Sequence, residues 1–109
     1  MASTYKVLGQ SDPVAATLTT VYTVPGATSA IVSTVMICNR SAVATTFRLA
    51  VRLAGAAIAN QHYIAYDQEI LGNEGFAYTI GATLATTDIF SVYATLATLS
   101  FNVFGEEIT

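Results

Sequence analysis

Charged residues are scarce in this sequence. Of 109 residues, 4 are Lys or Arg and 7 are Asp or Glu, so that only 10% are charged, where roughly 25% is usual in a soluble domain. The net charge of −3 argues against a nucleic-acid partner, since phosphates are bound by clusters of Lys and Arg. Hydrophobic residues make up 53%, and we therefore expect a partner to cover part of the surface.

Cysteine and histidine occur once each, as Cys38 and His62, and tryptophan is absent. One Cys and one His cannot close a zinc site, and a Ser-His-Asp hydrolase would depend on His62 alone. Asp67 follows His62 by five residues, which places the two side chains on opposite faces of a strand. We therefore expect no enzymatic activity, no metal and no cofactor, and we interpret His62 as a rim or interface residue.

The other acidic residues and the thiol have simple interpretations. Asp67 and Glu69 share a strand face and, with backbone carbonyls, would offer oxygen ligands to Ca²⁺. Solvated acids at a strand edge are the more common arrangement. Glu106 and Glu107 are interpreted as solubilising residues of a C-terminal tail, and Cys38 ends an apolar run, where a buried and unreactive thiol is usual.

Long apolar runs are also missing. No stretch of about 20 Leu, Ile, Val or Phe residues is present, so we expect no membrane contact. Residues 1–5 lack a basic start followed by an apolar run, which indicates synthesis in a cytosol without a secretory signal. Neither an internal repeat nor a linker divides residues 1–109, which we interpret as a single domain.

What the sequence does contain is short runs of Thr, Val, Ile, Tyr and Phe, which are typical of half-buried strands, separated by Gly, Pro, Asn and Asp. The pattern predicts a single helical turn within residues 54–61 and otherwise strands. The strands are expected at residues 5–8, 17–24, 30–38, 45–53, 62–70, 75–80, 89–95 and 99–104. Their length and spacing predict an all-β fold, an antiparallel β-sandwich of about eight strands, either jelly-roll or Ig-like.

The clearest alternation lies in residues 45–53. Alternate side chains from Phe47 onward would face the core, while Arg48 and Arg52 would face outward. These two arginines carry half of the positive charge, and we expect them to contact an acidic partner surface, with a solvated face as the alternative. Residues 31–38 are apolar on both faces, which predicts a central strand with something packed over its second face.

Eight aromatic residues alternate with small residues in the second half of the chain. Core packing is the expected role of most of them, and an aromatic platform for carbohydrate is the alternative. These residues are Tyr63, Tyr66, Phe76, Tyr78, Phe90, Tyr93, Phe101 and Phe104.

Four segments resemble small virion structural proteins of tailed bacteriophages. They are residues 21–25 (VYTVP), residues 38–41 (CNRS) running into 45–48 (TTFR), residues 59–67 (ANQHYIAYD) and residues 99–105 (LSFNVFG). The resemblance covers most of the chain from Tyr5 onward. It implies a β-sandwich that coats or braces the virion, either as a capsid decoration (cement) protein or as part of the tail or neck, and it brings no catalytic residue with it.

We therefore expect a capsid decoration protein that stabilises the phage head by bridging neighbouring major capsid subunits, as a homo-oligomer. It would be made in the host bacterial cytoplasm and bind other virion proteins. Its expected interface residues are Arg48, Arg52, His62 and Tyr66. A tail, neck or baseplate component is one alternative, and a carbohydrate-binding module for host adsorption is another.

Overall fold

The computed structural model describes residues 2–109, which form eight strands and two short 3-10 helices. Each expected strand is present, and the all-β sandwich is confirmed. Where one helical turn was expected within residues 54–61, the structure has two 3-10 helices at the ends of this segment, η1 (Leu53–Gly55) and η2 (Asn60–His62). The strands are β1 (Ser3–Ser11), β2 (Thr19–Thr23), β3 (Ser29–Asn39), β4 (Thr45–Arg52), β5 (Tyr63–Ile70), β6 (Gly75–Leu84), β7 (Ile89–Ala94) and β8 (Leu99–Ile108).

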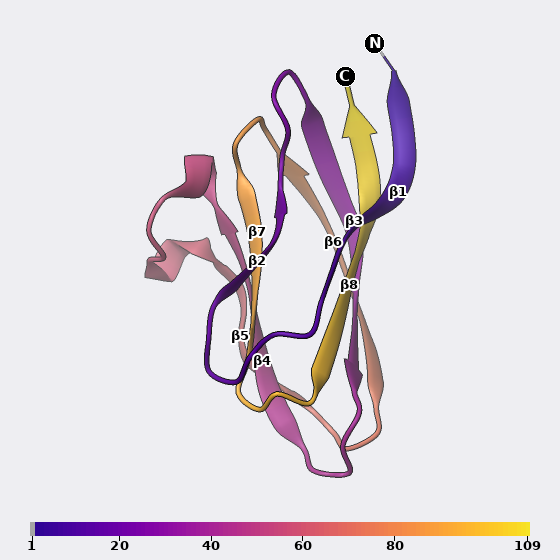
Figure 1. Ribbon diagram of the computed structural model, residues 1–109, viewed down its shortest axis with the longest axis vertical. Coiled ribbons are helices and arrows are strands. Elements are labelled where there is room, and N and C mark those ends of the chain that lie inside the picture. Colours follow the sequence, from indigo (N-terminus) through magenta and orange to yellow (C-terminus); the bar gives the residue numbers. More distant parts are fainter. Residues whose placement is uncertain (1) are drawn as a thin grey trace.

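The strands form two antiparallel sheets that face each other (Figure 1). Sheet A has the order β1-β8-β3-β6, and sheet B has the order β2-β7-β4-β5. The first strand pairs with the eighth, the second with the seventh, the third with the sixth and the fourth with the fifth, as in one long hairpin. The pairs β8–β3 and β7–β4 arise when this hairpin wraps on itself. This order is that of a jelly roll, which decides between the two sandwiches that the sequence allowed.

The core lies between the sheets and follows the expected alternation. Phe47 and Leu49 of β4 are fully buried, and so are Phe101 and Val103 of β8. The rings of Phe47 and Phe101 meet edge to face with centroids 6.2 Å apart, which joins the two sheets at their centre. The prediction that alternate residues from Phe47 face the core is confirmed for β4, up to Leu53, which lies exposed in η1.

One face of β3 differs from the expectation for residues 31–38. Val35 and Ile37 are fully buried, whereas Met36 and Cys38 face outward, and none of residues 2–109 packs over them. The expectation of a buried thiol is wrong. Cys38 pairs with Ser100 and with a glycine of β6 in the outward row of sheet A, so small neighbours leave the sulfur exposed.

The C-terminal residues are part of the sheet. The interpretation of Glu106 and Glu107 as a solubilising tail is wrong, because β8 continues to Ile108 and pairs with β1 on one side and β3 on the other. Ala2 and Thr109 exchange two backbone hydrogen bonds of 2.9 and 2.8 Å. The two ends of the chain therefore lie side by side at one end of the molecule (Figure 1).

A buried asparagine holds together the loops at the other end of β3. The Asn39 side-chain amide donates to the carbonyl oxygens of Val43 and Leu71, at 2.8 and 3.2 Å. Its Oδ1 accepts from the Ser41 amide at 3.1 Å. Asn39 thus fixes the bend that follows β3, at residues 41–43, against the β5–β6 loop.

Candidate interaction surfaces

The outer face of sheet B carries a cluster of one arginine, one aspartate and three tyrosines, which we call the arginine–tyrosine cluster. The Arg48 guanidinium carbon lies 4.1 Å from the ring centroid of Tyr66 and 4.4 Å from that of Tyr93. Tyr63 lies further away, at 5.8 Å. Arg48 Nε donates to Asp67 Oδ1 at 2.7 Å. The guanidinium is thus held by cation–π contacts and by an ion pair.

A β-bulge in β5 brings two of these residues onto the same arginine. Phe47 pairs with Gln68 and Leu49 with Ala65, which leaves both Tyr66 and Asp67 opposite Arg48. Asp67 has a φ of +50°, a region in which Asp is better tolerated than most side chains. Strict alternation would have separated Tyr66 from Asp67, so the bulge is what assembles the cluster.

The ion pair neutralises the arginine of the cluster. The hydrogen bond to Asp67 raises the pKa of Arg48 above its usual value, with a smaller contribution from Tyr63. The Arg48 side chain is only 21% exposed. The cluster therefore presents tyrosine rings and a compensated charge to the surroundings, instead of an open cation.

Two other expected interface residues lie on the same side of the molecule. Arg52 is four residues beyond Arg48 on β4, about 13 Å along the strand, and it donates to Ser91 Oγ, Thr20 Oγ1 and a loop carbonyl. His62 ends η2, and its Nδ1 accepts from the Ala59 amide at 2.9 Å. The structure thus brings Arg48 and Tyr66 together and leaves Arg52 and His62 apart from them.

Tyr93 is a member of the arginine–tyrosine cluster that was not expected on this surface. It is one of eight aromatic residues of which most were expected in the core. The signal for an outward position was present, since Tyr93 lies between Val92 and Ala94, which are both fully buried. Among the eight aromatic residues, Phe90 and Phe101 are buried and Phe76 and Tyr78 pack against the core; the cluster and Phe104 account for the others.

The outer face of sheet A is nearly uncharged and combines exposed apolar residues with small polar ones. Residues opposite each other in register share a face, and one outward row runs from Val7 of β1 through Phe104 of β8 to β3 and β6. Tyr5 is 82% exposed, Met36 38% and Phe104 37%. Of the described residues in the outward rows, Glu106 alone is charged. We call this surface the sheet A face.

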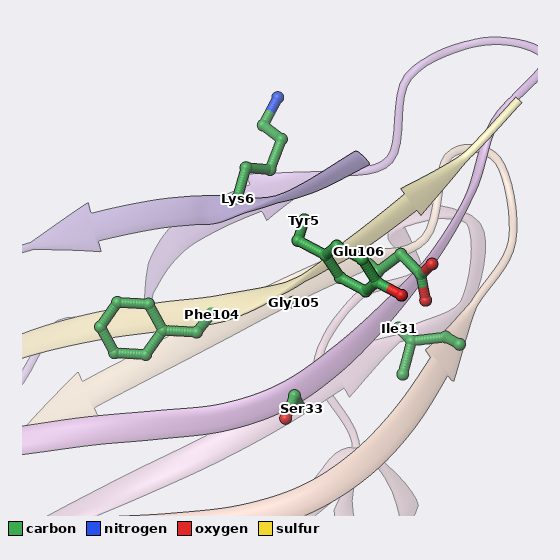
Figure 2. Close-up of a pocket in the computed structure, with 7 residues that line it drawn as sticks. All are labelled: Tyr5, Lys6, Ile31, Ser33, Phe104, Gly105 and Glu106. Carbon is green, nitrogen blue, oxygen red and sulfur yellow. The ribbon is translucent and has the colours of Figure 1, made fainter. Parts of the chain in front are cut away.

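A hollow of about 430 Å³ indents the sheet A face where two bulges meet. Gly105 forms its floor, and Figure 2 shows Phe104 on one side of Gly105 and Tyr5 and Ile31 on the other. The Lys6 amine points away from these side chains (Figure 2). The hollow is therefore lined mostly by apolar groups and suits an apolar side chain of a partner better than an ion.

A hydrogen-bonded group of three polar residues joins the two sheets near the termini. The Tyr22 hydroxyl donates to Glu107 Oε2 at 2.6 Å, and Lys6 Nζ donates to Oε1 at 3.1 Å. The hydrogen bond from Tyr22, followed by that from Lys6, lowers the pKa of the Glu107 carboxyl. Burial, with the hydrogen bond to Glu107, raises the pKa of Tyr22. Both shifts favour a charged carboxylate held by a neutral phenol.

We expect Glu107→Gln to destabilise the protein at neutral pH by about 1.5 to 3 kcal/mol, the range for a hydrogen bond to a charged group. The folded-state pKa of Glu107 lies below its ordinary 4.5, so its contribution is present above that pH and is lost as pH falls through the folded-state value. Urea unfolding at pH 7 and pH 3 measures this. The difference from wild type should shrink at pH 3, because this pH lies below the ordinary pKa of 4.5, so the unfolded state binds a proton and the contribution of the folded carboxylate falls.

Glu69→Gln is the matched control, because Glu69 is an exposed acid of β5. It should change the free energy of unfolding little at either pH. A Glu107→Gln effect that is equal at pH 7 and pH 3 would contradict the role given to the carboxylate charge.

Comparisons with protein families, with curated proteins and with solved structures find no match to the chain. No helix within residues 2–109 is long and apolar enough to span a bilayer. Within the same described range, no three His, Cys, Asp or Glu side chains gather where they would hold a metal ion.

Proposed function

We propose that this protein is a capsid decoration protein of a tailed bacteriophage, which binds the outside of the head and bridges neighbouring major capsid subunits. The observation that carries the proposal is the sheet A face. Exposed apolar patches of a few hundred Å² on a single chain usually mark a contact surface. The four strands have 9, 10, 11 and 10 residues and lie about 4.8 Å apart, which gives the whole face roughly 600 Å², shared between apolar and small polar residues.

This area agrees with a contact that is repeated many times. A standard stable interface covers about 800 Å² on each partner, so one copy of the sheet A face would bind weakly by itself. Copies at symmetric positions on a shell add their contacts, and two sites on one assembly raise the effective concentration of the second. A small subunit of this kind would brace a shell through many modest contacts.

The fold is compatible with this role and with others. Jelly rolls occur in viral capsid proteins, in lectins and in cupins, so the fold alone does not assign a function. The arginine–tyrosine cluster does not favour a glycan-binding platform, because Arg48 already covers the rings of Tyr66 and Tyr93 on which a sugar would stack. A position on the tail, neck or baseplate would use the same surface.

The test is occupancy on phage particles stripped of the protein and incubated with added variants. Met36→Lys places an unpaired charge at the centre of the sheet A face, where its burial against a partner is costly. We expect occupancy to require at least about tenfold more protein, equivalent to 1.4 kcal/mol. Arg48→Ser with Arg52→Ser tests the earlier prediction that these arginines dock on an acidic surface.

The outcomes separate the two faces. Loss of binding by the arginine variant, with Met36→Lys unaffected, would assign docking to sheet B and overturn the choice of the sheet A face. A second readout is Cys38, which is exposed on the sheet A face: its thiol should react with a maleimide in the free protein and be protected on the particle. Binding of neither wild type nor variants would contradict the decoration role itself.

A further inference from the structure

The four edge strands of the sandwich differ in how well they are protected. β1 and β6 are the edges of sheet A, and β2 and β5 are the edges of sheet B. Edge strands expose unpaired backbone groups, and monomeric proteins protect them with charges, proline, bulges or short length. β1 has Lys6 and a bulge, β2 has only 5 residues, and β5 has Asp67 in a bulge and Glu69.

β6 lacks this protection. Its 10 residues contain no charge and no proline. Its one irregularity lies at Ile80 and Gly81, of which Gly81 has a φ of +60°, so residues 75–79 form a regular edge. β3 pairs with one side of β6, and no other strand of residues 2–109 pairs with it. The outward side chains Ala77 and Thr79 are small and do not hinder the approach of another strand.

The core is also incompletely closed next to β6. Six hydrophobic residues pack against the core while only partly buried, and four of them are Phe76, Tyr78, Ile80 and Ala82 of β6. The Phe76 ring lies 5.8 Å from that of Phe47, so this row continues the core up to the edge. A strand added beside β6 would cover the same side chains that the sandwich leaves half-exposed.

We propose that β6 pairs antiparallel with β6 of a second copy of the chain, around a two-fold axis. The core-facing apolar side chains of β6 in one copy would then lie beside those of the other, and so would the small outward side chains. No like charges are brought opposite each other, because β6 has none. A charged partner strand would find no counter-charge along this edge, whereas a second copy is complementary by symmetry. Strand addition also pairs the free backbone groups of both copies.

The two-fold axis fixes the orientation of the two copies relative to each other. The two-fold axis of an antiparallel pair is perpendicular to the sheet, so sheet A becomes one continuous sheet of eight strands and both sheet A faces point the same way. Pairing of the two regular edges, residues 75–79, places Ala77 opposite Ala77 of the second copy and spans about 17 Å. The contact therefore falls in the class below about 1,200 Å² that associates weakly. The dimer does not rest on the proposed function, but it would double the docking face.

Sedimentation velocity of the whole protein, at micromolar concentrations up to about 200 μM, tests the dimer in the absence of any particle. We expect wild type to dimerise in this range, and Ala77→Lys to raise the dissociation constant about tenfold or more. Met36→Lys is the matched control. Met36 pairs with Ala77 in register, so it places the same charge on the same face, one strand away from the proposed contact.

Dimerisation that survives Met36→Lys and is lost in the β6 variant supports the proposal. Loss in both variants would show that two sheet A faces stack on each other, and a wild-type protein that stays monomeric throughout the range would also overturn the proposal. If the β6 variant unfolds by circular dichroism, disulfide formation by Ala77→Cys in a Cys38→Ser background replaces it. Cross-linked dimers are expected, and their absence at dimerising concentrations would refute the β6 contact.

Discussion

Replacing Phe101 with Ala is expected to lower the free energy of unfolding by about 3 to 5 kcal/mol. Phe101 is 0% exposed at the centre of the core, and its ring contacts that of Phe47 from the opposite sheet. Truncation removes a large buried surface and leaves a cavity between sheets that cannot collapse while both stay paired. Small domains are stable by about 5 to 15 kcal/mol, so this variant would lie close to unfolding. Urea denaturation at neutral pH measures the change.

Phe104→Ala is the matched control in the same strand. Phe104 lies three residues further along β8, so its side chain is on the outer face of sheet A, where it is 37% exposed. Its truncation should cost well under about half as much, because little apolar surface is removed from the core. Equal losses for the two variants would contradict the division of β8 into a core face and an outer face.

Replacing Gly105 with Ala is expected to cost about 3 kcal/mol, at the upper end of what overpacking usually costs. A Cβ at this position would overlap the backbone carbonyl of Ile31 and lie 2.8 Å from Leu8 Cδ1. The carbonyl belongs to the neighbouring strand β3, so it can give way only if β8 and β3 separate at the hollow. Thermal unfolding, with a substantial fall in Tm, is the measurement.

Gly26→Ala provides the comparison, since a Cβ there would meet no atom within 4 Å. Its unfolding temperature should equal that of wild type or be slightly higher, because alanine restricts the unfolded chain. A Gly105→Ala variant as stable as Gly26→Ala would show that β3 and β8 do not approach as closely as described.

The strands were predictable because their signals are local. Alternation in β4 and turn residues such as Asn39 act over a few positions, and the structure has the alternation as expected and a bend at residues 41–43, just after Asn39. The strand order was not predictable to the same extent. Ser3 pairs with Ile108, and nothing in either segment specifies a partner so far along the chain, so the sequence left jelly-roll and Ig-like sandwiches equally open.

The interaction surfaces were predictable only in part, and bulges are the reason. Alternation correctly placed Arg48 and Arg52 outward. It could not place Tyr66 and Asp67 together, because the bulge that does so interrupts the period on which the inference depends. Glu107 was taken for a tail residue because its binding partner Tyr22 lies in the other sheet.

The position of β8 in sheet A has a consequence for how the molecule forms. β1 and β3 do not pair with each other, since β8 lies between them and pairs with both. The first strand of the chain thus has its place in sheet A only after the last strand has arrived. Such pairing over long sequence distances slows folding, because the chain must be closed into large loops before the contacts repay the lost entropy. During synthesis on the ribosome, β1 and the side of β3 that faces β8 would have unpaired backbone groups until β8 leaves the ribosome.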